Sequence, residues 1–362
     1  MTRNKNAFDL LRLLLAISVI ISHSILIGGY KIQDPLTILS KNQTSFADFG
    51  VMGFFALSGY LITASFERTR NVFNFATNRL LRILPGFWVC LFVTAFILAP
   101  LIFLANEKNW NDFPFTGDGS STNYLLNNFF LPIRQWSINE VLNEASYRES
   151  LNGSLWSLYP EIQCYSFTVI AGLLGLFNKN RTLYLLFSIT IFIFFSINSI
   201  LPKSYGPTIL ILSPALKLYS SYIAGSLTYV FRDQMILDKK GTISLTLFTL
   251  VLLKFGGYNL LSPVLIALTL LNVFQLFTFN IKYDVSYGVY IYSFPVQQLL
   301  FQIFGGKLDV LYFIALSLLI SVFLGFLSYV LIEKPFIDLR TKTKLTFPSP
   351  LFKKKEGIKS TS

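Results

Sequence analysis

Charged residues are scarce in this sequence. Only 13% of its 362 residues are Asp, Glu, Lys or Arg, whereas a soluble domain carries about 25%. With 53% hydrophobic residues, a chain of this length could not cover a soluble surface with polar side chains. Its apolar residues fall in blocks of about twenty, which matches the thickness of the hydrocarbon core of a bilayer. The composition therefore excludes a soluble protein and indicates a membrane protein.

Cysteine is also nearly absent. Cys90 and Cys164 both lie within apolar blocks, so no disulfide framework is predicted. No small-residue cleavage pattern ends the first apolar block, and further blocks follow it, so we expect an uncleaved first span rather than a signal peptide. We expect no metal cofactor.

The apolar blocks are continuous, as in residues 189–195, and do not alternate with polar residues as the strands of a membrane barrel do. In lipid each backbone N–H and C=O must be paired within its own segment, so these blocks are predicted to be helices. The predicted fold class is all-α, a polytopic transmembrane helix bundle. We expect about ten spans, at residues 8–28, 46–65, 85–104, 153–176, 182–200, 207–231, 242–257, 260–279, 286–305 and 309–332.

The net charge of +12 resembles that of a nucleic-acid-binding protein, but basic loops on one side of a membrane explain it more simply. Most of the 30 basic residues fall in alternate connections if the N-terminus is cytoplasmic, for example in 68–82, 232–240 and 334–359. This asymmetry predicts that the N- and C-termini are both cytoplasmic. We therefore expect a multi-pass protein of the bacterial inner membrane, with the lipid bilayer as a partner and no nucleic acid.

Two regions follow from this topology. Residues 1–338 are predicted to form one transmembrane domain, and residues 339–362 a basic, flexible cytoplasmic tail. The longest connection, about 105–152, is predicted to lie outside and contains Trp110 and Trp136. This connection could fold over the outer face and meet a polar acceptor, or it could be a solvated connector.

The only histidine, His23, lies deep in the first predicted span. Arg12 precedes it by eleven residues, close to three helical turns, so both side chains lie on one helix face about 16 Å apart. Asp9 can pair with Arg12 one turn away. A neutral imidazole can accept a proton from a hydroxyl at neutral pH. Alternatively, His23 could bond to another helix, and Arg12 could be a topological signal that reaches the membrane surface.

Two further polar groups lie near or within predicted spans. Glu161 lies about eight residues into the fourth span, where a carboxyl group must be paired or protonated. The preceding Pro160 is expected to disturb the helix there and could open a pocket. Arg79 and Arg82 lie three residues apart, so their guanidinium groups can clamp phosphates from one helix face. A structural role for Glu161 and a topological role for the two arginines stay open.

Together these residues resemble the acyltransferase family 3 of membrane proteins. Asp9-Leu10-Leu11-Arg12 followed by His23 is similar to the arginine, ten residues, histidine signature of that family. Further similar motifs, in the family's order, are Phe54-Phe55-Ala56-Leu57-Ser58-Gly59-Tyr60-Leu61-Ile62, Arg79-x-x-Arg82 with Pro85, Ser154-Leu155-Trp156-Ser157-Leu158 with Glu161, Ser286-Tyr287-Gly288-Val289-Tyr290 and Glu333-Lys334-Pro335-Phe336. The resemblance covers residues 5 to about 338.

The resemblance implies ten helices and transfer of an acyl group, usually acetyl, from acyl-CoA to a hydroxyl of a cell-surface or lipid-linked carbohydrate such as O-antigen or exopolysaccharide. It implies that His23 is the catalytic base and that Glu161 belongs to the catalytic centre. Arg79 and Arg82 would hold the phosphates of CoA near the cytoplasmic face. The other implied residues are Arg12 and Tyr287 in the donor site and Trp156 and Ser286 in the acceptor site.

One residue departs from the family's pattern. Ser293 stands where the family often has a second histidine, which indicates an altered acceptor or weakened activity. Two rival functions therefore stay open. One is a transporter or flippase of a glycan, because polar groups within spans also line transport paths. The other is an inactive scaffold of glycan assembly.

Overall fold

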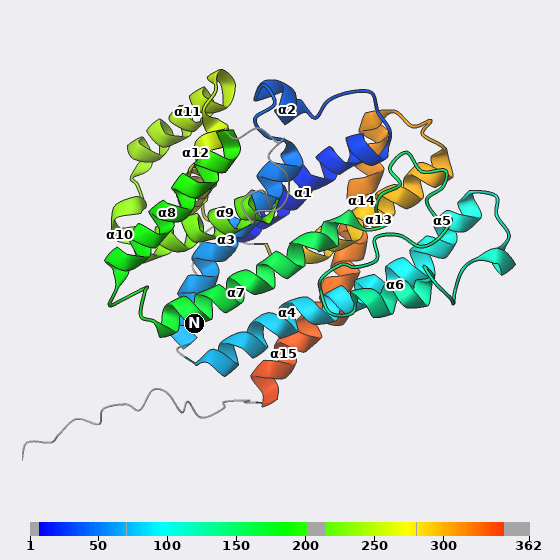
Figure 1. The fold of residues 1–362 in the computed structure, drawn as a ribbon, viewed down its shortest axis with the longest axis horizontal. Helices are drawn as coiled ribbons and strands as arrows, with labels where there is room; N and C mark the ends of the chain where they lie inside the picture. Colours follow the sequence, from blue (N-terminus) through cyan, green and yellow to red (C-terminus); the bar gives the residue numbers. More distant parts are fainter. Residues whose placement is uncertain (1–6, 70, 201–213, 280, 344–362) are drawn as a thin grey trace, which may run out of the picture.

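The computed structural model describes residues 7–69, 71–200, 214–279 and 281–343, and all regular structure within these ranges is helical. The predicted all-α class is thus confirmed for the described part of the chain. The long helices run side by side in a bundle, with α5 and α6 at one end (Figure 1). In chain order the elements are α1 (Phe8–Ile27), α2 (Pro35–Leu39), α3 (Phe46–Thr69), α4 (Val72–Val93), π-helix η1 (Thr94–Leu98), α5 (Ala99–Ala105), 3-10 helix η2 (Trp110–Asp112), α6 (Ser121–Asn128), 3-10 helix η3 (Gly153–Ser157), α7 (Leu158–Leu173), α8 (Arg181–Ile200), α9 (Ala215–Val230), α10 (Arg232–Met235), α11 (Lys239–Phe255), α12 (Tyr258–Gln275), α13 (Ser286–Phe304), α14 (Val310–Ser328), π-helix η5 (Tyr329–Glu333) and α15 (Lys334–Thr343).

Each of the ten predicted spans coincides with a helix, although residues 207–213 of the sixth lie outside the described ranges. In the described part, six helical segments are long and apolar enough to cross a membrane: α1, α3, Val72–Ala105, α8, α12 and Val310–Leu339. Of the others, α7, α9 and α11 have 16 or 17 residues, and α13 carries three buried glutamines. The count of ten spans and the side of each terminus stay predictions.

The third predicted span belongs to a longer helical segment than expected. Val72–Ala105 comprises 34 residues, about 50 Å at the rise of an α-helix, whereas the predicted span began at residue 85. The side chain of Asn71 accepts a hydrogen bond from the backbone of Asn74 and caps this helix. The early start places Arg79 and Arg82 on the helix itself, with Pro85 inside it.

The fourth predicted span begins irregularly. Residues Gly153–Ser157 form a 3-10 helix and α7 starts only at Leu158. Pro160 therefore lies in the first turn of α7, where a backbone N–H has no partner within the helix. The prediction that Pro160 disturbs the helix is wrong, because a proline in the first turn removes no helical hydrogen bond.

The centre of the bundle is the close contact of α3 with α9. A Cβ atom on Gly225 would lie only 1.8 Å from the backbone oxygen of Ala56, so only glycine permits this approach. Nearby, the hydroxyls of Thr63 and Ser226 are 2.7 Å apart. Cys90 and Cys164 are both unpaired and buried.

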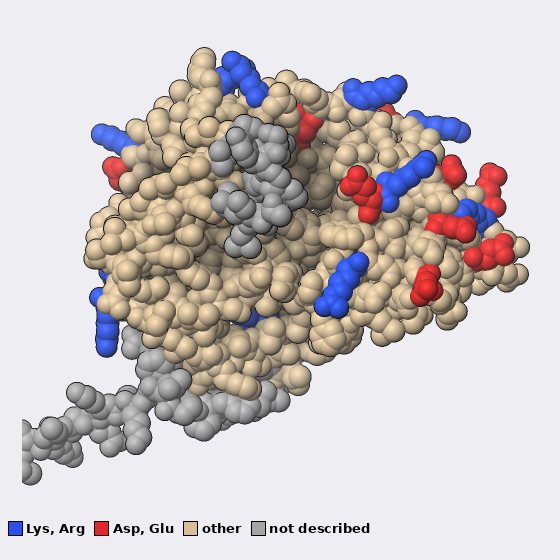
Figure 2. Space-filling model, in the orientation of Figure 1, with Lys and Arg blue, Asp and Glu red and all other residues tan. Residues whose placement is uncertain are grey.

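Residues 106–152 fold onto one end of the bundle, which we call the loop end. Ile138, Val141, Leu142 and Leu151 of this connection are buried in a core shared with α1, α4 and α13. The alternative of a solvated connector is therefore wrong. Acidic side chains gather over this end, at the right of Figure 2, and a hollow lies near the centre of the same face.

The predicted boundary at residue 338 falls within α15, which continues to Thr343. The rest of the predicted tail, residues 344–362, lies outside the described residues.

Candidate functional site

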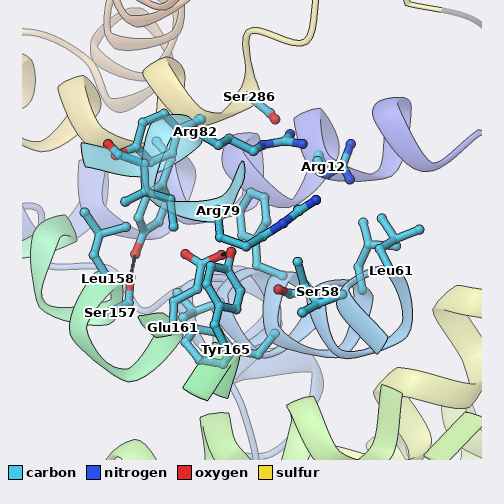
Figure 3. A pocket seen from close by; sticks show the side chains of 18 residues that line it. Arg12, Ser58, Leu61, Arg79, Arg82, Ser157, Leu158, Glu161, Tyr165 and Ser286 are labelled. Atoms are coloured by element: carbon cyan, nitrogen blue, oxygen red, sulfur yellow. Dashed lines mark hydrogen bonds between the residues drawn. The ribbon is translucent and has the colours of Figure 1, made fainter. Parts of the chain in front are cut away.

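One cavity in the bundle is lined by three arginines. We call it the arginine cavity, and its volume is about 120 Å³. Figure 3 shows the guanidinium groups of Arg12, Arg79 and Arg82 gathered in it, with Ser157 and Glu161 on the opposite side. Its walls come from α1, α3, α4, α7 and α13 and also include Ser58, Tyr165, Ser286, Tyr287 and Tyr290.

Two of the arginines share one carboxylate. Oδ2 of Asp284 lies 2.8 Å from Nη2 of Arg82 and 3.3 Å from Nη1 of Arg12. Asp9 lies 2.8 Å from the same nitrogen of Arg12, as its spacing predicts. Ser286 donates to Oδ1 of Asp284 at 2.6 Å. These contacts fix the guanidinium groups of Arg12 and Arg82 in the wall of the cavity before a ligand arrives.

Asp284 was not identified from the sequence. It lies in the short connection between α12 and α13, where an acidic residue looks like an ordinary loop residue. Burial by itself raises the pKa of this carboxyl, but the charges of Arg12 and Arg82 and the hydrogen bonds from Ser286 outweigh burial and hold its pKa below the usual value. Asp284 is therefore ionised at neutral pH and balances the arginines.

Arg79 has weaker polar partners in the protein than Arg12 and Arg82, which pair with carboxylates. Its Nη2 donates to Ser65 at 3.2 Å, and its guanidinium lies 5.9 Å from the ring centre of Phe75. Its Nε is buried and has no hydrogen-bond partner within the described ranges, where no carboxylate lies within ion-pair distance of it either. A buried donor without a partner is costly, so Arg79 is the arginine best suited to bind an incoming anion.

The remaining polar groups of this cavity are mostly engaged with protein atoms. Glu161 accepts a short hydrogen bond from the hydroxyl of Tyr165, one turn further along α7. The hydroxyls of Ser157 and Tyr290 lie 2.8 Å apart. The hydroxyl of Tyr287 donates to the backbone oxygen of Ile83 at 2.9 Å, so this residue joins α13 to the helix that carries the arginines.

The second cavity, the histidine cavity, lies at the loop end and has a volume of about 860 Å³. Nδ1 of His23 is buried and has no hydrogen-bond partner in the described part of the chain. Its ring packs edge-on against Phe294, with the centroids 5.1 Å apart. The cavity is rich in aromatic side chains, from the long connection and from the start of the fourth span: Trp136, Tyr147, Trp156 and Tyr159.

His23 also borders a smaller opening on its other side. This side pocket is lined by Ser22, Tyr30, Asp34 and Ser45 and shares His23 and Leu26 with the histidine cavity. Both carboxylate oxygens of Asp34 already accept hydrogen bonds there, from backbone N–H groups at the start of α2 and from the backbone of Phe46. The imidazole thus borders both the histidine cavity and the side pocket.

The start of the fourth span separates the two cavities. Leu158, Glu161 and Tyr165 line the arginine cavity, whereas Tyr159 and Gln163 line the histidine cavity. Leu158, Glu161 and Tyr165 follow one another at spacings of three and four residues, so they share one face of α7. Tyr159 and Gln163 are four residues apart and share a different face. Among the described residues, none lines both cavities.

Helices α1 and α13 each reach both cavities. Arg12 and His23 of α1 lie about 16 Å apart along the helix. On α13, Tyr290 lines the arginine cavity, and Phe294, one turn later, lines the histidine cavity. The ring of Phe54 also packs on Tyr290, at a centroid distance of 5.6 Å. On α13, an aromatic side chain thus borders each of the two cavities.

The structure divides the predicted site residues between these cavities. Trp156 lies in the histidine cavity with His23, and its role in acceptor binding stays a prediction. Glu161 and Ser286, predicted for catalysis and for the acceptor, lie with the arginines and not beside His23. Ser293 is buried and donates to the backbone of Tyr290. The full sets are Arg12, Arg79, Arg82, Glu161, Ser286 and Tyr287 in the arginine cavity, and His23 and Trp156 in the histidine cavity.

The sequence left open whether the long connection meets an acceptor, and it did not indicate which of its residues would border a cavity. Trp136, Tyr147 and Glu149 border the histidine cavity. The two tryptophans of that connection were visible in the sequence, but nothing in their spacing distinguishes Trp136 from Trp110, which borders neither cavity.

Comparisons with known proteins identify the family to which the chain belongs. The family model of acyltransferase family 3, described as an acyltransferase domain, matches residues 5–331. An O-acetyl transferase of Shigella phage Sf6 is 26% identical over 357 residues, which cover 94% of this chain and 98% of that protein. Nodulation protein 10 of Rhizobium leguminosarum bv. viciae is 37% identical over 86 residues, 24% of this chain and 23% of that protein. No solved structure matches this chain significantly.

Proposed function

Because the chain belongs to acyltransferase family 3, we propose that it transfers an acetyl group from acetyl-CoA to a hydroxyl of a carbohydrate. The observation that carries this proposal is the pairing of two chemically different cavities by α1. One cavity presents guanidinium groups and the other presents an unpaired imidazole among aromatic rings. The extensive similarity to a phage O-acetyl transferase supports acetyl as the group transferred.

The donor's phosphates bind at the arginine cavity. Guanidinium groups form paired hydrogen bonds with phosphate oxygens, and Arg79 has a buried N–H without a partner in the described residues. The cavity, of about 120 Å³, is too small for a nucleotide. The nucleotide therefore stays at its mouth, and the slender pantetheine arm enters the bundle.

The acceptor binds in the histidine cavity. Its volume of about 860 Å³ lies in the range of small-molecule sites, about 300–1,000 Å³. Aromatic rings such as those of Trp136 and Trp156 offer flat apolar faces to the C–H faces of a sugar ring, and polar rims satisfy its hydroxyls. This combination suits a carbohydrate better than a charged or wholly apolar acceptor.

In the reaction, the acceptor hydroxyl loses its proton to His23 while its oxygen attacks the thioester carbonyl. A carbon–oxygen bond forms and the carbon–sulfur bond breaks. The thiolate of CoA leaves and takes a proton, which returns His23 to its neutral state. Transfer through an acetyl group held on His23 balances equally well, so the direct and two-step routes both stay open.

The arm must pass the aromatic groups between the cavities. Tyr290 is held by Ser157 and Phe54, and Phe294 lies on the imidazole. Rotation of these side chains about their own bonds would connect the two cavities without moving a helix. The distance of about 16 Å along α1 between Arg12 and His23 then becomes the path of the arm.

The orientation follows from the basic residues of the sequence. With both ends of the chain in the cytoplasm, the arginine cavity opens to the side where acetyl-CoA is made, and the loop end faces outward. The chain then acts in the bacterial inner membrane on a surface or lipid-linked glycan.

The test is mass spectrometry of surface glycans from cells with and without the gene. Deletion is expected to remove the mass of one acetyl group from the repeat and to leave chain length unchanged. Loss of whole glycan chains would instead indicate a transporter. Release of CoA by the purified protein with acceptor present excludes an inactive scaffold, and its absence would contradict the proposal.

A further inference from the structure

The histidine cavity continues into a groove between α7, α8 and α9, which we call the apolar groove. Gln163 and Tyr219 line both spaces, and the hydroxyl of Tyr219 donates to the side-chain oxygen of Gln163. Beyond this polar pair the walls become apolar, and the groove has a volume of about 440 Å³. Its apolar side chains include Phe167, Phe187, Ile191, Phe194, Leu216 and Ile223.

The groove lies where lipid can reach it. Among the six helical segments of the described part that are long enough to span a membrane, α8 is the least buried. Only 17% of the residues in its most apolar 18-residue stretch are buried inside the protein. Its lining residues, from Phe187 to Phe194, cover about 10 Å of helix axis. The groove therefore extends from the cavity that holds His23 along α8, a helix that packs on α9 and α12 and leaves most of its other side chains at least partly exposed.

The change from polar to apolar walls along this path suits an amphiphilic molecule. Polar atoms occur at Gln163 and Tyr219, where the groove meets the aromatic cavity, and hydrocarbon side chains follow. An amphiphile with a polar group at this junction would place a sugar beside His23 and a chain among the apolar residues. A free oligosaccharide has no part that this groove would bind.

Resting on the proposed function, we infer that the apolar groove binds the hydrocarbon chain of a lipid-linked carbohydrate acceptor. A chain that moves from bilayer to groove leaves one apolar medium for another, so little hydrophobic free energy is gained. The benefit is positional, because a tethered sugar reaches His23 at a raised effective concentration. We therefore expect a moderate preference for lipid-linked acceptors rather than an absolute requirement.

The experiment uses the full-length protein in phosphatidylcholine nanodiscs with acetyl-CoA. The acceptor is the unacetylated oligosaccharide repeat from a deletion strain, either free or joined through phosphate to a farnesyl chain. Ile191→Trp narrows the middle of the groove. The matched control is Ile193→Trp, the same substitution on the lipid face of α8, where the side chain is 56% exposed.

We expect the wild type to favour the farnesyl-linked acceptor about tenfold in kcat/KM. Ile191→Trp should lower kcat/KM for the farnesyl-linked acceptor about fivefold and leave kcat/KM for the free acceptor at its wild-type value. Ile193→Trp should leave both values unchanged. Because both variants experience the same partitioning of the acceptor into lipid, their difference isolates the groove. Equal effects in the two variants, or none, would show that ordinary phospholipid occupies the groove and would overturn the inference.

A second measurement needs no substitution. Farnesyl phosphate carrying a diazirine is photolysed with the wild-type protein, and the labelled peptides are identified. Labels on α7, α8 and α9 support the groove, and labels confined to other helices contradict it. If neither acceptor is acetylated, the proposed function fails, whereas this cross-link still decides whether the groove binds a lipid chain.

Discussion

The arginine cavity and the histidine cavity differ in whether their functional groups are paired with other protein groups. Arg12 and Arg82 are held by one carboxylate, that of Asp284, whereas His23 leaves its buried Nδ1 without a partner in the described residues. The first arrangement fixes charges for a ligand that must be anchored. The second keeps a group available to exchange a proton. Substitutions in the two cavities should therefore affect different steps of the reaction.

The largest effect is expected from His23→Ala. Removal of a general base lowers kcat by about 10²–10⁴-fold, and donor binding should stay at its wild-type value, because His23 does not border the arginine cavity. Initial rates of acetyl transfer and calorimetric binding of CoA measure the two quantities. His23→Gln, which keeps most of the side-chain volume, should lose as much activity; acetylation at the normal rate in either variant would refute the proposed role.

Arg79→Ala tests the opposite cavity. Loss of a paired charge-assisted contact should weaken donor binding about 10- to 100-fold, with a smaller change in kcat. The control is Lys179→Ala, which removes a basic residue on an exposed turn outside both cavities. If the two variants weaken CoA binding equally, the effect is one of net charge and the arginine cavity is not the donor site.

Trp156→Ala should distinguish acceptor binding from donor binding. The loss of one aromatic wall is expected to raise KM for the acceptor about tenfold and to leave KM for acetyl-CoA unchanged. Trp110→Ala is the matched control, because Trp110 belongs to the long connection but borders neither cavity. A rise in KM for the donor alone would contradict the division between the cavities.

Asp284→Asn should lower the thermal midpoint near neutral pH by about 2–4 °C, the effect of roughly 1 kcal/mol. The pKa of Asp284 is below its usual value in the folded protein, so its contribution is fully present above the unfolded-state pKa of about 3.9 and is lost as pH falls through the lower folded value.

The wild type and Asp284→Asn should therefore converge in stability in acid, as measured by thermal unfolding at a series of pH values. A difference that stays constant down to the lowest pH would show that the charge of Asp284 is not the cause.

The smallest effect is expected at Ser293, at the position where the resemblance to the family predicts a second histidine. Its hydroxyl is buried and bonds to the preceding turn of its own helix, so Ser293→Ala should change kcat by less than about twofold. Acetyl-transfer rates measure this change. A loss of more than about tenfold would mean that this hydroxyl takes part in the reaction.

Much of the fold could be predicted from the sequence because each helix is specified locally. Apolar blocks long enough for a bilayer, with no competing partner for their backbone groups, must be helical. The early start of α4 was missed because residues 72–84 contain polar side chains, whose helical state depends on a cap at Asn71 and on neighbours. The packing of residues 106–152 was not predictable, because its buried apolar residues show no regular spacing.

The sequence by itself determined that this chain is a helical membrane protein, and it singled out His23, Glu161 and the arginines, because ionisable groups are rare in or beside such segments. Only the tertiary structure paired Arg12 with Asp284, 272 residues away, and placed Glu161 with the arginines rather than beside His23. The physical reason is that helical spacing fixes which residues share a face, whereas the packing of helices against one another decides which cavity that face meets.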